Sequence, residues 1–276
     1  VMSKAAYMLP ALRSGARMGD TKAIDSMVAV LTDPFGVGHM GITAENLAAK
    51  YDISREAQDT FAVESQRRAA AAIAAGHFKS QILPIVNQSR KGEVVFDTDE
   101  HPRPGVTLEA LAKMKPAFKK DGTVTAGNAS GINDGAAFCV LAAADVAAKA
   151  GYKPMARLVS YAVAGVPHET LGEGPIPATR LALKKAGLDL SQMDVIESNE
   201  AFAAQALAVA ATLGLDPAKT NPNGGAIALG HPVGCTGAFI AIKALYELER
   251  IGGKYCLVTM CIGGGQGIAT IFERMG

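Results

Sequence analysis

A glycine-rich stretch, Asn221–Gly237, constrains the fold of this 276-residue chain more than any other segment. It reads NPNGGAIALGHPVGCTG, and its glycines allow tight turns and the close approach of backbone or ligand. Pro232 fixes φ directly after His231. An apolar run at helical spacing follows the stretch. The pattern therefore predicts that His231 sits on a constrained loop just ahead of a helix, where catalytic side chains are commonly displayed.

Two further stretches place reactive side chains at the ends of predicted strands. Val195–Gln205 passes from a short apolar strand into an alanine-rich helix, with Asn199 at the corner. Tyr255–Gly265 is an apolar strand that leaves Cys261 at its carboxyl end, ahead of three glycines. Ligands of α/β proteins bind outside the carboxyl ends of strands. We therefore expect Asn199, His231 and Cys261 to converge on one site.

The spacing of apolar residues predicts an α/β architecture. Beyond Pro154, strands and helices alternate, which favours a mostly parallel sheet covered by helices. Upstream, Ser54 is the predicted N-cap of a long helix and Gly76 its stop. The expected strands are 82–86, 94–96, 136–144, 156–164, 194–197, 255–261 and 267–273; the expected helices are 43–51, 54–75, 107–114, 145–151, 177–186, 203–213 and 236–251; and 1–41 and 122–135 are expected to be irregular.

Composition excludes several classes of protein. With 49% hydrophobic and 19% charged residues, the chain can bury a substantial core, which excludes disorder. The net charge of +1, with no basic stripe, argues against nucleic acid as a partner. No apolar run reaches the length of a membrane span. The four cysteines form no Cys-x-x-Cys pair, so we expect reduced thiols and no metal. We also expect a cytoplasmic location and no permanently bound cofactor.

Three motifs carry a family resemblance. Asn199-Glu200-Ala201-Phe202, Gly230–Gly237 and Cys261–Gly265 resemble, in order and spacing, the three C-terminal signatures of the thiolases. The likeness extends through 39–46 and 122–135 along essentially the whole chain. It implies a thiolase-like α/β fold, with a C-terminal βαβαβαββ half plus the loop domain and the tail of the N-terminal half. The implied domains are 1–132, holding a tetramerisation loop and coenzyme A-binding loops, then 133–153 as that tail, and 154–276.

The resemblance also implies a reaction. A thiolase is an acyltransferase that condenses two acyl-CoA molecules, such as acetyl-CoA, to a 3-ketoacyl-CoA, or runs the reverse thiolysis. His231 would accept the proton of a nucleophilic cysteine, and Cys261 would take the α-proton of the incoming acetyl-CoA. His231 with a water held by Asn199 would form one oxyanion hole, and the Gly263 N–H would contribute to the other. We expect the loops around His231 and Gly263 to lower the pKa of the reacting thiols.

The same resemblance supplies binding residues and a partner. It implies a homotetramer joined through the loop Ala6–Ile24. The residues that would line the acyl and coenzyme A sites are His39, Met40, Arg103, Phe118, Ala126, Ser130, Ala201 and Phe202.

One departure from the family pattern concerns the acylated cysteine. In thiolases it lies upstream of the segment that matches Val1-Met2-Ser3, so we expect this chain to lack it together with most of the N-terminal half. Cys139 and Cys256 are predicted to be buried packing residues, and Cys235 a spectator thiol. We further expect the isolated 276-residue chain to be inactive in thiolysis and prone to aggregation, because the strand 136–144 would lie uncovered.

Two alternatives remain open from the sequence. The decarboxylating ketoacyl synthases are related, but a cysteine base in Cys261–Gly265 argues against them; transfer from malonyl thioesters would favour them. The other alternative is a non-catalytic coenzyme A-binding or subunit-interaction protein, since the pocket residues survive without the nucleophile.

Overall fold

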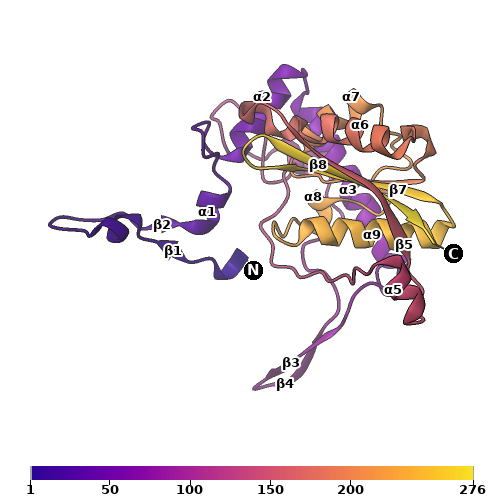
Figure 1. Ribbon diagram of the computed structural model, residues 1–276. Helices are drawn as coiled ribbons and strands as arrows, with labels where there is room; N and C mark the ends of the chain where they lie inside the picture. The colour runs from indigo at the N-terminus through magenta and orange to yellow at the C-terminus, as the bar shows by residue number, and fades with distance from the viewer. Residues whose placement is uncertain (1, 276) are drawn as a thin grey trace.

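The computed structural model describes residues 2–275, and a four-stranded sheet lies at the centre of this part of the chain (Figure 1). The strand order is β5-β8-β7-β6. β6 and β7 pair in parallel, whereas β8 is antiparallel to both β5 and β7. β5, β6 and β7 therefore run in one direction. The strands are β5 (Ala156–Gly165), β6 (Val195–Ser198), β7 (Tyr255–Ile262) and β8 (Gln266–Arg274).

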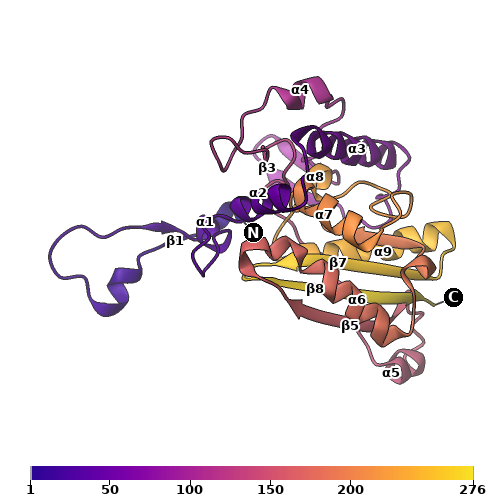
Figure 2. The same ribbon diagram turned by 90° about the horizontal axis from the view of Figure 1, so that it is seen from above.

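Helices cover both faces of this sheet, with α6 and α7 on one face and α9 on the other (Figures 1 and 2). Leu257 of β7 packs with Ile176 of α6, whereas its neighbour Val258 packs with Ile240 of α9. This alternation follows from the two-residue period of a strand. Because both faces are buried, β7 is apolar along nearly its whole length. The covering helices are α6 (Pro175–Ala186), α7 (Ala203–Leu213) and α9 (Thr236–Ile251).

A second layer packs outside α7 and carries the long helix α3 (Figure 2). Ser54 caps α3 by accepting the N–H of Ala57 over 3.1 Å, and Gly76 follows with φ +75°, as the sequence predicted. Ala69 and neighbouring residues of α3 contact the short helix α8. The remaining helices and strands are α1 (Ser26–Val30), α2 (Met40–Lys50), α3 (Arg55–Ala74), β3 (Ile85–Ser89), β4 (Gly92–Phe96), α4 (Leu108–Ala112), α5 (Ala144–Lys149) and α8 (Ala226–Leu229), with 3₁₀ turns at Met2–Lys4, Pro10–Ser14, His168–Glu173 and Leu190–Gln192.

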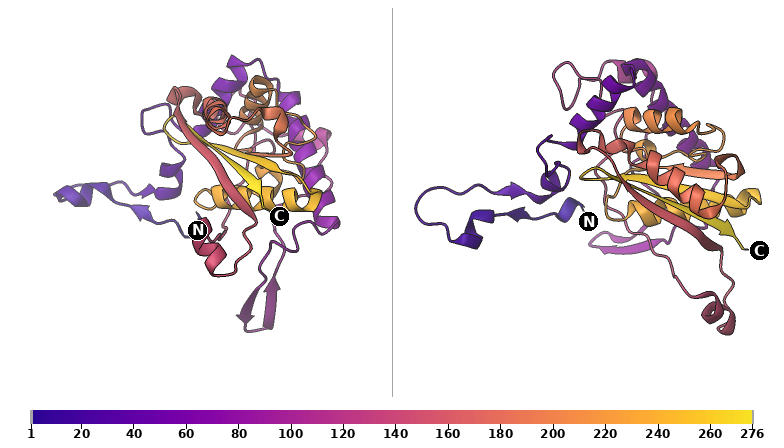
Figure 3. Two further views of the ribbon diagram at one scale, coloured as in Figure 1. Left: turned by 45° about the vertical axis from the view of Figure 1, so that its right-hand side comes forward. Right: turned by 45° about the horizontal axis from the view of Figure 1, so that its top comes forward.

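Two segments project from this body (Figures 1 and 3). The first is the N-terminal excursion, in which β1 (Tyr7–Met8) pairs with β2 (Ile24–Asp25) and the chain between them is exposed. The second is the hairpin of β3 and β4, which is exposed along its whole length. Both segments carry exposed apolar side chains.

The structure corrects three expectations. Residues 136–143 form no strand and are mostly exposed, with Val140 96% accessible, because no neighbouring strand of the described chain offers them backbone partners. A mostly parallel sheet was expected, but only the pairing of β6 with β7 is parallel, and the other two pairings are antiparallel. The expected order βαβαβαββ implies a strand between α7 and α9. In its place the structure has a single isolated bridge, between Ile196 and Thr220.

A buried ion pair ties α9 to β6. The Lys243 ammonium lies 2.8 Å from the Glu197 carboxylate, and each side chain is at most 2% exposed. Lys243 also donates to the Gly224 carbonyl, so it links α9 with the glycine-rich loop. Burial raises the pKa of Glu197, and the neighbouring cation acts against that rise. Removing either partner alone would leave the other as a buried charge without a counter-ion.

We predict strong non-additivity at this pair. Lys243→Met leaves Glu197 buried without a cation and should lower the free energy of unfolding by about 3–5 kcal/mol. Adding Glu197→Met removes the stranded charge, so the double variant should recover much of that loss. Urea unfolding measures both. Lys149→Met is the matched control, since Lys149 and Asp145 form an exposed pair and the change should cost at most about 0.5 kcal/mol. A double variant with a lower free energy of unfolding than Lys243→Met would contradict the prediction.

Candidate active site

Two strand ends bring Asn199 and Cys261 to one edge of the sheet. β6 and β7 are parallel neighbours in which Ser198 faces Thr259, and the Asn199 N–H donates to the Thr259 carbonyl over 3.0 Å. Cys261 lies two residues beyond Thr259, roughly 7 Å farther along its strand. Asn199 therefore directly follows β6, and Cys261 is the last residue but one of β7, so both lie at the carboxyl ends of adjacent parallel strands, as the sequence pattern predicted.

Thr236 holds the His231 ring in one tautomer. The Thr236 hydroxyl lies 3.0 Å from the Pro232 carbonyl, to which it donates its single proton, and 2.6 Å from His231 Nδ1. The hydroxyl therefore accepts from Nδ1–H, and Nε2 keeps its lone pair. The Asn199 amide nitrogen faces Nε2 at 3.4 Å. His231 thus presents a proton acceptor beside Asn199.

Burial keeps His231 uncharged. Loss of solvent lowers the pKa of this imidazole to about 4, from an ordinary value of 6.5. At neutral pH the ring is therefore a free base. The turn that delivers it requires glycine, because Gly230 has φ +95° and a Cβ there would lie 2.6 Å from the Asn133 side chain.

The thiol of Cys261 is protonated at neutral pH. Burial raises its pKa to about 11, above the ordinary 9.0, and a backbone hydrogen bond opposes that rise only in part. The expectation that neighbouring loops lower this pKa is therefore wrong for Cys261, because the loss of solvation outweighs the favourable contact. A protonated thiol is a proton donor, whereas His231 is an acceptor. The site therefore offers one acid and one base.

Three glycines turn the chain after Cys261. Gly264 and Gly265 have φ of +79° and +84°, a region that favours glycine. A Cβ on Gly263 would lie 2.7 Å from the end of the Met40 side chain, so Met40 packs directly on Gly263. The backbone N–H groups of this turn lie beside the Cys261 position.

Aromatic rings from three segments form one wall near the site. His39 stacks on Phe118 with ring centroids 4.7 Å apart, and Phe118 meets Phe202 edge-on at 6.0 Å. His39 Nδ1 also accepts the Gly41 N–H over 3.0 Å and so caps α2. A side chain on Gly41 would overlap the Phe118 ring, so this glycine makes room for the wall. Burial lowers the pKa of His39.

Backbone pairing pins the loop of residues 122–135 beside the same corner. The Ser130 N–H donates to the Ala201 carbonyl over 3.0 Å, and the Ala203 N–H donates to the Asn128 carbonyl over 2.8 Å. The loop therefore runs directly against the turn between β6 and α7. This contact places Ser130 next to Ala201, and the family resemblance gives both as binding residues.

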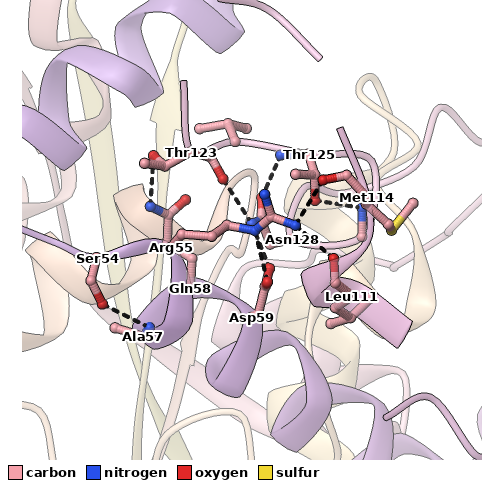
Figure 4. Close-up of polar contacts among 12 residues, drawn as sticks. Ser54, Arg55, Ala57, Gln58, Asp59, Leu111, Met114, Thr123, Thr125 and Asn128 are labelled. Carbon is pink, nitrogen blue, oxygen red and sulfur yellow. Dashed lines mark hydrogen bonds and ion pairs between the residues drawn. The ribbon is translucent and has the colours of Figure 1, made fainter. Parts of the chain in front are cut away.

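A polar network at the start of α3 holds the outer part of this loop (Figure 4). Asp59 accepts from Asn128 Nδ2 over 2.8 Å and from Arg55 Nε over 2.7 Å. Gln58 Nε2 donates to the Thr123 hydroxyl over 2.9 Å. Arg55 continues to two carbonyls at the end of α4. The loop is therefore fixed from both sides.

Two of the predicted binding residues lie apart from these contacts. Ala126 is exposed at the tip of the loop, and Arg103 is exposed on the segment after β4, where its backbone N–H donates to Gln66 over 2.9 Å. Within residues 2–275, no hydrogen bond or ring contact connects either of them with His231 or Asn199.

The other cysteines differ from expectation at one position. Cys256 is fully buried in β7, as predicted. Cys139 is exposed on the extended segment, and its predicted burial is wrong because that segment forms no strand. Cys235 is half-buried directly before α9, and burial raises the pKa of its thiol.

Sequence reasoning missed the group that fixes the corner after β6. The buried Glu200 carboxylate accepts from the Ser65 hydroxyl over 2.7 Å, from Asn221 Nδ2 over 2.8 Å and from the Ile227 N–H over 3.3 Å. It thereby joins α3, the strand corner and the glycine-rich loop. Its place directly after Asn199 was the available signal. Thr236 and Asn133 were also missed, because a hydroxyl and an amide in Gly- and Asn-rich loops carry no distinctive pattern.

Comparison with known proteins identifies the family. The family model for the thiolase N-terminal domain matches residues 1–145, and that for the thiolase C-terminal domain matches residues 152–274. This chain belongs to the thiolase family. It is 61% identical to the β-ketothiolase BktB of Cupriavidus necator and 56% identical to an acetyl-CoA acetyltransferase of Pseudomonas aeruginosa. Each alignment covers 99% of this chain and 70% of the relative.

Solved structures agree on the thiolase fold. The crystal structure of the Bacillus anthracis acetyl-CoA acetyltransferase matches with a TM-score of 0.96 and 48% identity, covering 100% of this thiolase chain and 70% of that chain. Human mitochondrial 3-ketoacyl-CoA thiolase matches with a TM-score of 0.92. Neither alternative, the decarboxylating synthase or the non-catalytic binding protein, finds support in these relatives. The thiolase is therefore assigned as an enzyme.

The described part of this thiolase lacks two kinds of feature. Among residues 2–275, no cluster of three or more His, Cys, Asp or Glu side chains is arranged to hold a metal ion. None of the described helices combines the length and the apolar character needed to cross a membrane.

The low pKa of His231 predicts a pH-dependent loss of stability. Below pH 6.5 the unfolded chain takes up a proton at this histidine, while the folded chain does not until about pH 4, so stability falls as the pH falls through this window. Down to pH 5 the contribution is about 2 kcal/mol. His231→Asn should therefore lose about 2 kcal/mol less than wild type between pH 7 and pH 5 in urea unfolding. Equal losses would remove His231 as the cause.

Proposed function

We propose that this thiolase catalyses the reversible condensation of two acyl-CoA molecules, acetyl-CoA among them, to a 3-ketoacyl-CoA. The observation that carries the proposal is the position of Asn199, whose amide nitrogen lies 3.4 Å from His231 Nε2 and whose N–H bonds to Thr259, two residues before Cys261 in β7. His231 is unprotonated at neutral pH, and the Cys261 thiol is protonated. One group accepts a proton and the other donates one, which is what carbon–carbon bond cleavage by a thiol requires. Coenzyme A thioesters are the substrates, and no permanently bound cofactor takes part.

In the acylation step, a cysteine thiol attacks the thioester carbonyl and its proton passes to His231 Nε2. The carbon–sulfur bond to coenzyme A breaks, and the departing thiolate takes that proton back. We assign the attacking thiol to none of the four cysteines in residues 1–276. Before it gives this proton up, the His231 imidazolium can donate its Nε2–H to the oxyanion. Asn199 Oδ1 is buried without a partner among the described residues, so this amide has capacity left to orient a water at the same place.

In the condensation step, Cys261 first passes its proton to the neutral imidazole of His231 and then removes one from the α-carbon of acetyl-CoA. The carbanion forms the new bond to the acyl carbon, the enzyme thioester breaks to a thiolate, and His231 returns its proton to that thiolate. In thiolysis the same thiol returns a proton to the leaving carbon. Because its pKa is about 11, Cys261 begins in the form that thiolysis uses. The Gly263 N–H is proposed as a donor to the second oxyanion.

The proposed binding surface uses residues from every segment around this site. The aromatic wall would contact the pantetheine and acyl parts of the substrate, with Met40 against Gly263 at its inner end. Arg103, on the exposed loop, is proposed to meet the nucleotide. The binding residues are His39, Met40, Arg103, Phe118, Ala126, Ser130, Ala201 and Phe202. A cytoplasmic location would keep the four free thiols reduced.

We expect Cys261→Ala and His231→Ala to fail differently in enzyme expressed from its full coding sequence. Cys261→Ala should slow condensation by a factor on the order of 10²–10⁴ while acylation by acetyl-CoA proceeds. His231→Ala should slow both steps, because this residue acts in each. Stopped-flow acylation and steady-state condensation separate the two effects, with Cys139→Ala as the exposed-thiol control. Condensation retained within tenfold in Cys261→Ala would exclude Cys261 as the base.

We also propose a homotetramer joined through the loop Ala6–Ile24. The loop projects from the body (Figure 1). Its apolar side chains, including Tyr7 at 69% and Met18 at 100% exposure, have no cover within the described chain. Such a surface is commonly an interface. The pairing of β1 with β2 gives the loop a defined base, so every copy of the chain would present the same apolar side chains for contact with the loops of other copies.

Shortening this loop tests the tetramer. Replacing residues 9–23 by a two-residue Asn-Gly turn keeps the pairing of Met8 in β1 with Ile24 in β2 and removes the apolar tip. Light scattering should then show a smaller assembly than the unmodified protein, with unchanged circular dichroism. An unchanged assembly mass would place the interface elsewhere.

A further inference from the structure

A chain of hydrogen bonds leads from the backbone of His231 to a second histidine. The His231 N–H donates to Asn133 Oδ1 over 3.0 Å. Asn133 Nδ2 lies 3.2 Å from His101 Nδ1, and His101 Nε2 lies 3.2 Å from the Ile227 carbonyl. Ile227 belongs to α8, which immediately precedes the His231 turn. The chain therefore closes a ring of contacts around the base of the catalytic loop.

The direction of every bond in this chain is determined by chemistry. A carbonyl oxygen only accepts, so His101 Nε2 must carry a hydrogen. A neutral imidazole has one N–H, which leaves Nδ1 as an acceptor for Asn133 Nδ2. The Asn133 amide is then oriented with Oδ1 toward the His231 N–H, which is a donor. The three requirements agree, and they hold together only while His101 is neutral.

Two glycines pack directly against this chain. A side chain on Gly131 would overlap the His101 ring, and a Cβ on Gly230 would lie 2.6 Å from the Asn133 amide. Ile132, between Gly131 and Asn133, forms a parallel bridge with His231. The glycine backbone therefore bounds the His101 ring and the Asn133 amide on one side.

We propose that His101 and Asn133 are positioning residues that fix the backbone at His231 and thereby aim its Nε2. The proposal rests on the proposed function for the role of His231 as the proton acceptor. Thr236, the first residue of α9, contacts the imidazole ring and the Pro232 carbonyl, but its hydroxyl does not bond to the backbone of His231. Asn133 supplies the anchor from outside the loop. A misplacement of about 1 Å at a reacting group can cost about a hundredfold in rate.

The protonation state of His101 controls this anchor. A proton on Nδ1 turns that atom into a donor, so the Asn133 amide must reverse and present Nδ2 to the His231 N–H, donor against donor. Burial lowers the pKa of His101 and so protects the neutral form. On its own segment, Arg103 also lowers this pKa and Asp99 raises it. Across from the ring stand the neutral Asn133 amide and the Ile227 carbonyl, which raises it.

Two variants of His101 separate positioning from simple packing. An asparagine places its oxygen near the position of Nδ1 and keeps the acceptor for Asn133, whereas a glutamine places its nitrogen near Nε2 and keeps the donor for Ile227. We expect His101→Asn to retain kcat within about threefold and His101→Gln to lose about tenfold or more, with KM unchanged in both. Matching losses in the two variants would show that the ring acts only as a space-filler, against the proposal.

Amide hydrogen exchange tests the anchor without any assay of activity. In NMR on the assembled protein, the His231 N–H should be protected in wild type and in His101→Asn, and it should exchange at least about tenfold faster in His101→Gln and Asn133→Ala. If this pattern appears without thiolase activity, the proposed function fails while the positioning role stands. Unchanged protection in Asn133→Ala overturns the positioning role.

A second variant keeps the test decisive if Asn133→Ala does not fold. Asn133→Asp still accepts the His231 N–H, but its second oxygen faces His101 Nδ1 and attracts a proton there. The pKa of His101, followed by NMR titration, should rise above its wild-type value by at least about one pH unit. Asp134→Asn, an adjacent exposed change at a residue bonded to Ser3, is the control and should leave the titration of His101 nearly unchanged. No rise in Asn133→Asp would refute the direct contact.

Discussion

The buried carboxylate of Glu200 is the contact on which the arrangement of the site depends. It accepts hydrogen bonds from α3, from Asn221 and from the start of α8, so one side chain joins the scaffold helix to both loops of the site. Burial raises the pKa of Glu200, and its donors oppose that rise. A carboxylate buried to this degree is tolerable only with several donors. Glu200 directly follows Asn199, and Asn221 and Ile227 belong to the glycine-rich loop that carries His231, so this carboxylate ties the two parts of the site together.

The electrostatics of the site suit a reaction that runs in both directions. Burial lowers the pKa of His231 and raises that of Cys261, and both shifts favour the uncharged form. An uncharged imidazole is a base and an uncharged thiol is an acid. The same loss of water thus creates both partners of a proton exchange without any charged neighbour. Substrate binding, by bringing donors to the developing charges, is then the step that makes the charged forms accessible.

Local signals predicted much of the fold and less of the site. The bounds of α7 and α9 and the Ser54 cap follow from apolar spacing and helix-end chemistry, which are properties of neighbouring residues. The reversed direction of β8 depends on which strands meet in space. Residues 136–143 look like a buried strand by composition, but composition does not supply a pairing partner. At the site, motifs identified Asn199, His231 and Cys261, whereas the tautomer of His231 required the geometry of the Thr236 hydroxyl.

The position of β8 in the sheet has a consequence for the order in which the chain is made. β5 is made first among the four strands, yet its partner in the described sheet is β8, which is made after the other three and fits between β5 and β7. Until then β5 has an open edge on the side where β8 will pair, and β7 has only the parallel contact with β6. The turn that holds Gly263 directly precedes β8, so the catalytic edge is completed only once β8 has been made. A nascent chain that has not reached β8 therefore carries no assembled site, and its unpaired edges are the ones a chaperone would meet.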